Sequence, residues 1–116
     1  MSLANNDLEE ILQTYLILMD TEKYFEAHEV LEEAWHLLRF HKDPLANLAK
    51  GLINGAIAFE HLKRNKERSV VRAQRVIVSY ERHKHLCVEG IEYFMLFAKA
   101  CKKIEILKKK YMLHGV

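Results

Sequence analysis

The stretch that decides the fold is residues 43–64, which read DPLANLAKGLINGAIAFEHLKR. Asp43 can cap a helix, and Pro44 fits a first helical turn, where its missing N–H leaves no hydrogen bond unmade. Apolar residues then return at helical spacing along one face: Leu48, Leu52, Ala56, Phe59 and Leu62. The stretch therefore predicts a long helix that buries one side in a core.

A second stripe of this helix is small and polar, and it consists of Asn47, Gly51, Asn54, Ala58 and His61. Gly51 costs about 1 kcal/mol of helix propensity relative to alanine. A glycine kept at that cost indicates the close approach of another helix or access for a ligand. We expect this stripe to face the polar edge of the preceding helix.

Helical periodicity continues on both sides of this stretch. Capping residues and breaks divide the chain into helices of about 7–19, 21–38, 44–64, 66–84 and 91–112, with Asp20 or Thr21 capping the second. No segment alternates polar and apolar residues over enough positions to suggest a strand. With short connections, these features predict one all-α domain over residues 1–116, a compact bundle of four to five helices.

Composition narrows the class of protein. Of the 116 residues, 50% are hydrophobic and 29% are charged, which fits a single core. No run approaches the ~18 apolar residues of a membrane span, and the N-terminus lacks the features of a signal peptide. We therefore expect a soluble, cytoplasmic protein with no membrane partner. Cys87 and Cys101 lack the spacing of a zinc site or a disulfide framework.

Charge is distributed unevenly along the chain. Residues 1–35 carry nine Asp or Glu and one Lys, whereas residues 36–116 carry seventeen Lys or Arg and seven Asp or Glu. One side of the fourth predicted helix and its approach carries arginines at positions 64, 68, 72, 75 and 82. We expect the acidic and basic helices to neutralise each other inside the bundle, and we do not expect nucleic acid as a partner. A nucleic-acid-associated role through the basic helix remains a second alternative.

Leftover apolar residues on the two oppositely charged helices suggest self-association. Val30 and Leu37 lie among the acids of the second helix, and Val71 and Val78 lie beside the arginines of the fourth. The expectation that follows is a symmetric homodimer in which these helices meet.

The second helix brings a histidine and a carboxylate to the boundary between core and solvent. His28 and Glu32 lie one turn apart at the edge of its apolar arc, with Trp35 close by on the core side. Glu26, Glu29 and Glu33 point away from the core. We expect Asn54 and His61 of the third helix to lie opposite His28 and Glu32.

Over roughly residues 20–110 the chain resembles the family called domain of unknown function 309. The likeness lies in residues 25–35 (FEAHEVLEEAW), in residues 50–54 (KGLIN) and in His61. The family pattern is an aromatic residue, His-Glu-x-x-Glu, a Trp, and a Gly-Leu-Ile-polar segment that ends in His. The segment after His61 lacks the Gly-Asn-x-x-Gly of many relatives. The resemblance implies an all-α bundle among small bacterial proteins and no settled activity.

The polar cluster supports three hypotheses. In the first, the chain is a binding or scaffold module whose ligand site comprises His28, Glu29, Glu32, Asn54 and His61. In the second, a divalent metal ion held by His28, Glu32 and His61 serves a hydrolase-like enzyme with Glu29 as a base. In the third, His28, Glu32, Asn54 and His61 form a hydrogen-bonded network that fixes the register of two helices. Whether the protein is an enzyme stays open.

Overall fold

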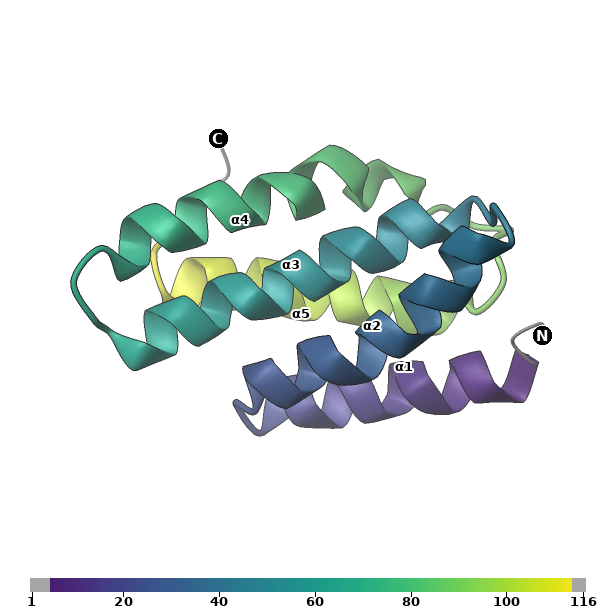
Figure 1. Cartoon of the computed structure of the whole chain (residues 1–116), viewed down its shortest axis with the longest axis horizontal. Coiled ribbons are helices and arrows are strands. Elements are labelled where there is room, and N and C mark those ends of the chain that lie inside the picture. The colour runs from purple at the N-terminus through teal and green to yellow at the C-terminus, as the bar shows by residue number, and fades with distance from the viewer. Residues whose placement is uncertain (1–4, 114–116) are drawn as a thin grey trace.

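The computed structural model describes residues 5–113 and is all-helical (Figure 1). Its elements are α1 (Asn5–Asp20), α2 (Tyr24–Phe40), α3 (Leu45–Arg64), α4 (Ser69–His83), the short 3₁₀ helix η1 (Lys84–Leu86) and α5 (Phe94–Lys110). No strand occurs within this part of the chain, which confirms the predicted all-α bundle. None of these helices combines the length and the hydropathy that crossing a lipid bilayer requires.

Helix α3 occupies the middle of the bundle. It packs most extensively against α4 and α2, which flank it on opposite sides (Figure 1). Helix α1 packs against α2 and α5, and α5 also contacts α3. One line of α3 side chains, spaced three and four residues apart, stays partly or fully exposed: Asn47, Lys50, Asn54, Ile57, His61 and Arg64. Most of the rest of the helix is buried, so α3 is the element around which the core forms.

Gly51 lies at the contact between α3 and α4. A Cβ atom at this position would lie 3.1 Å from the Cα atom of Tyr80 and 3.4 Å from the carbonyl oxygen of Ser79. The predicted close approach of a helix at Gly51 is therefore confirmed, but the expected partner is wrong. Gly51 faces α4 and not α2, because α3 is flanked on both sides and periodicity alone does not say which neighbour a stripe meets.

Two further contacts complete the enclosure of α3. Gly55 faces α5, where an added Cβ atom would lie 2.7 Å from Cδ1 of Ile104. From α1, the buried hydroxyl of Tyr15 donates a hydrogen bond to the carbonyl oxygen of Leu52 at 2.8 Å. Helix α3 therefore contacts each of the other four α-helices.

The helix ends confirm one predicted cap and correct another. The carboxylate of Asp43 accepts a hydrogen bond from the backbone N–H of Leu45 at 2.8 Å, as the sequence predicts. Thr21 does not cap α2, because its hydroxyl donates to the carbonyls of Ile17 and Leu18 and so closes α1. Helix α2 begins at Tyr24 without a side-chain cap.

Ion pairs join the acidic N-terminal part of the chain to α5. The Lys103 ammonium lies 3.1 Å from Asp20, and the Lys110 ammonium lies 3.8 Å from Glu22. The expected neutralisation of acidic by basic helices therefore occurs at these contacts with α5 and not between α2 and the arginine-rich α4. Within residues 5–113 no ion pair joins α2 to α4, because α3 lies between the two helices (Figure 1).

A polar network fastens α4 to α5. The Tyr80 hydroxyl donates a hydrogen bond to Glu105 at 2.5 Å. The Lys108 ammonium lies 2.9 Å from Glu81 and 3.1 Å from Glu105. Burial acts to raise the pKa of both carboxyl groups, but the hydrogen bonds from Lys84, Lys108 and Tyr80 outweigh it, so the pKa of each lies below its ordinary value.

Replacing Gly51 with leucine tests the contact between α3 and α4. We expect Gly51→Leu to lower the free energy of unfolding by about 1–3 kcal/mol, because the added side chain meets the backbone of α4. Asn47→Leu, at an exposed position of the same helix, should stay within about 0.5 kcal/mol of wild type. Urea denaturation measures both. Wild-type stability of Gly51→Leu would contradict the close approach of the two helices.

The network between α4 and α5 predicts a loss of stability in acid. Because Glu81 and Glu105 have lowered pKa values in the fold, they stabilise it above their unfolded pKa of about 4.3, and this contribution disappears as the pH falls through the folded pKa. Lys108→Met should therefore flatten the dependence of the unfolding free energy on pH between about pH 5 and pH 3. The exposed Lys109→Met is the control. Equal pH dependence in the Lys108→Met variant and wild type would contradict this assignment.

Candidate ligand-binding site

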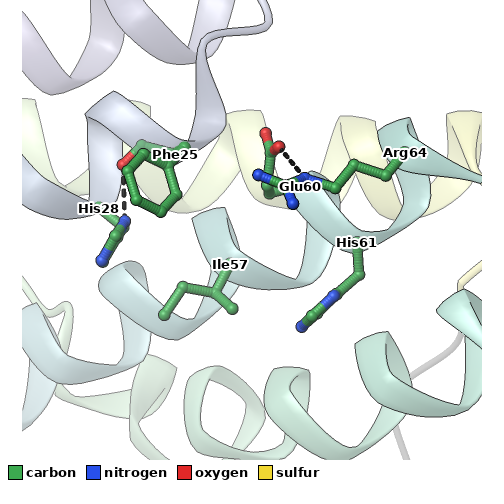
Figure 2. A pocket seen from close by; sticks show the side chains of 6 residues that line it. All are labelled: Phe25, His28, Ile57, Glu60, His61 and Arg64. Carbon is green, nitrogen blue, oxygen red and sulfur yellow. Dashed lines mark hydrogen bonds and ion pairs between the residues drawn. The ribbon is translucent and has the colours of Figure 1, made fainter.

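A pocket of about 240 Å³ opens between the start of α2 and the end of α3 (Figure 2). Phe25 and His28 line it from α2, and α3 contributes Ile57, Glu60, His61 and Arg64. Helical spacing explains the lining, since residues three, four and seven apart share one face of a helix. In Figure 2 the side chain of Ile57 lies between the two imidazoles. The pocket therefore has an apolar floor with a histidine on each side.

The structure brings together two of the five predicted site residues. His28 and His61 line the same pocket, although they lie on different helices. Glu29 is exposed on the outer side of α2, and Glu32 and Asn54 are half-buried outside the pocket. Among the described residues, no hydrogen bond or ion pair joins two members of the predicted network, and no three His, Cys, Asp or Glu side chains are placed to hold a metal ion.

Four lining residues were not predicted as site residues: Phe25, Ile57, Glu60 and Arg64. The signal for three of them is present in the sequence, because positions 57, 60, 61 and 64 share one face of a helix. His61 also shares a stripe of the helix with Gly51, but Gly51 faces α4. Phe25 is 45% exposed and so forms part of the pocket wall.

The ring of His28 is held in one orientation. Its Nδ1 atom lies 2.6 Å from the carbonyl oxygen of Phe25, and the Phe25 ring meets the imidazole edge-on with centroids 4.9 Å apart. A carbonyl oxygen can only accept a hydrogen bond, so Nδ1 carries the proton. In the neutral ring, Nε2 of His28 is therefore left with a free lone pair.

His61 is held in its neutral form. Burial lowers the pKa of its imidazole most, and the positive charges of Arg72 and Arg64 lower it further, whereas Glu60 acts weakly in the opposite direction. Because the pKa of His61 lies below its ordinary value, the imidazole is uncharged at neutral pH. It therefore offers one donor and one acceptor nitrogen.

The end of the pocket beside His61 is positively charged. The Nε atom of Arg64 lies 2.6 Å from Glu60, and the Arg64 side chain is 53% exposed. This pair leaves the terminal NH₂ groups of Arg64 unoccupied by Glu60, and Arg72 of α4 lies close enough to affect His61. Two guanidinium groups and one carboxylate therefore give this end an excess of positive charge.

The other residues of the α2 motif lie outside the pocket, further along α2. Trp35 is partly buried against the core, and its ring lies 4.3 Å from the ammonium of Lys50 and 5.3 Å from the guanidinium of Arg39. Cations at these distances gain cation–π attraction. Trp35 therefore anchors α2 to α3, and Phe25 and His28 are the residues of the motif that line the pocket.

The region that forms the pocket also identifies the family. Residues 12–73 match the model of the family described as Domain of unknown function (DUF309). The chain belongs to this family. The matched residues run from α1 into α4 and contain every lining residue of the pocket, so the resemblance seen in the sequence is confirmed. No curated protein and no solved structure matches the chain.

The electrostatics of this DUF309 pocket predict the titration of His61. Its NMR midpoint should lie below the ordinary histidine pKa of about 6.5, and Arg72→Gln should raise it by removing one positive charge. Arg75→Gln, on the same helix, is the matched control and should leave the midpoint unchanged. A midpoint at or above about 6.5 in wild type would contradict the burial of His61 beside two arginines.

Proposed function

We propose that this chain is a binding module whose pocket between α2 and α3 holds a small organic anion with one apolar part. The observation that carries the proposal is the placement of His28, His61 and Arg64 around Ile57. Ligand sites in proteins are mostly apolar, with a few polar groups that fix the orientation of the ligand. This pocket has that composition, and its polar groups come from two different helices.

The volume of the pocket limits the size of the ligand. Pockets for drug-sized ligands measure about 300–1,000 Å³, whereas this one measures about 240 Å³. A single ring or a short aliphatic chain fits such a space, with its apolar surface against Ile57 and Phe25.

The charge around the pocket favours an anion. Arg64 and Arg72 outnumber Glu60 near His61, and a guanidinium presents paired N–H groups in the geometry that suits carboxylates and phosphates. The neutral His61 adds a hydrogen-bond donor without adding charge. A carboxylate or a phosphate monoester on a small apolar group is therefore the chemistry that matches this end of the pocket.

A divalent metal ion is the alternative occupant. In its favour, His28 donates from Nδ1 to a carbonyl oxygen, which is the arrangement that orients metal-binding histidines. Against it, Glu32 does not line the pocket, and the described residues hold no group of three ligands. Glu29, the proposed base of a hydrolase, is exposed outside the pocket. We therefore derive no metal-dependent reaction.

Binding of simple probes tests the proposal. Benzoate and phenyl phosphate should bind with a dissociation constant on the order of 1 mM, because few atoms make contact, and neutral benzyl alcohol should bind at least about tenfold more weakly. Amide shifts in ¹⁵N-labelled protein locate the site, and calorimetry gives the affinity. Arg64→Gln should weaken the binding of both anions, whereas His85→Ala, at an exposed histidine outside the pocket, should not.

Three results would contradict the proposal. The first is the absence of shifts around the pocket with either anion, and the second is equal affinity for benzyl alcohol. The third is stoichiometric binding of zinc that is lost in His28→Ala and that excludes benzoate, since this result supports the metal site instead.

A further inference from the structure

The outer face of α4 carries arginines that have no partner within the described chain. Arg68, Arg72, Arg75 and Arg82 are exposed, and within residues 5–113 none of them forms an ion pair. Val71 lies on the same face and is 41% exposed, and Val78 is partly exposed beside it. Arginine mixed with exposed apolar side chains is typical of protein interfaces. The two valines therefore favour an interface over a face that only contacts solvent.

The outer face of α2 has the opposite charge and a similar pattern. Glu26, Glu29 and Glu33 are exposed and form no ion pair within residues 5–113. Val30 and Leu37 are partly exposed on this side of the helix. Because α2 and α4 flank α3 on opposite sides (Figure 1), these two faces cannot meet within one molecule.

The two faces match in length and in register. Residues 26–40 and residues 68–82 each span about 21 Å of helix. When the helices are aligned antiparallel, Arg82 lies opposite Glu26 and Arg75 lies opposite Glu33. The same alignment places Val78 opposite Val30 and Val71 opposite Leu37. A parallel alignment with Arg75 opposite Glu33 would instead place Val71 opposite Glu29, so the pattern favours the antiparallel arrangement.

A hollow on the acidic side fits this alignment. Glu33 lines a depression of about 260 Å³ between α1 and α2, together with Asp7 and Glu10 and the apolar residues Ile11, Ala34 and Leu37. An arginine opposite Glu33 would place its aliphatic stem on the apolar residues and its guanidinium among the carboxylates. Arg75 is the residue that the register places there.

We propose that the partner of the α4 face is a second copy of this chain, with α4 of one copy packed antiparallel against α2 of the next. Since the two faces lie on opposite sides of the bundle, the contact is head-to-tail, and a two-fold symmetric dimer is not expected. This association uses residues outside the α2–α3 pocket and is independent of the function proposed for it.

Sedimentation velocity of wild type and of two variants, one with reversed charges on α4 and one with reversed charges on α2, tests the proposal. Wild type should show a weight-average mass that rises with concentration in about 20 mM salt and falls toward the monomer in about 500 mM salt. Arg75→Glu/Arg82→Glu and Glu26→Arg/Glu33→Arg should each be monomeric. An equimolar mixture of the two variants should associate again, because every α2–α4 contact between unlike copies then joins opposite charges.

Controls separate this contact from misfolding and from general charge effects. Circular dichroism should show the wild-type helix content in both variants, and both should keep the benzoate affinity of wild type. Lys102→Glu/Lys109→Glu, at exposed positions of α5 outside the two faces, should associate as wild type does.

A wild type that stays monomeric at low salt overturns the proposal, as does a mixture that fails to associate. Tight binding of single-stranded oligonucleotide by monomeric wild type would assign the α4 face to nucleic acid instead.

Discussion

The contact between Gly51 of α3 and the backbone of α4 is the constraint on which the rest of this structure depends. An added Cβ atom would lie 3.1 Å from the Cα atom of Tyr80, so no larger residue allows α4 to lie where it does without a shift. This contact keeps α4 on the side of α3 opposite to α2 (Figure 1). The environment of the pocket and the separation of charge both follow from that position.

The pocket obtains its chemistry from this packing. Helix α2 supplies an imidazole fixed by its own backbone carbonyl, at His28. Helix α3 supplies His61, and α4 brings Arg72 near enough to lower the pKa of that imidazole. A local hydrogen bond therefore sets the tautomer of His28, whereas burial and neighbouring charge lower the pKa of His61. The proposed selectivity for a small anion rests on this combination.

The same packing leaves a negative charge on the outer face of α2 and a positive charge on the outer face of α4 that are not neutralised within the described part of the molecule. Within the described chain, the N-terminal acids form ion pairs with Lys103 and Lys110 of α5. Lys108 pairs with Glu81 of α4 and Glu105 of α5. These two carboxylates therefore stabilise the contact between α4 and α5. Within residues 5–113 the glutamates of α2 and the arginines of α4 form no ion pairs, because α3 separates the two helices. An association between copies is the arrangement that would neutralise both faces.

The sequence by itself determined the helical class, the cap at Asp43 and the close approach at Gly51, and it indicated His28 and His61 as candidate site residues. These features depend on local spacing and backbone chemistry, which a single chain displays directly. Only the tertiary structure decided which helix each stripe meets, since α3 has neighbouring helices on several of its faces. It therefore separated Glu32 and Asn54 from the pocket, added Ile57 and Arg64 to it, and placed α3 between the acidic and basic helices.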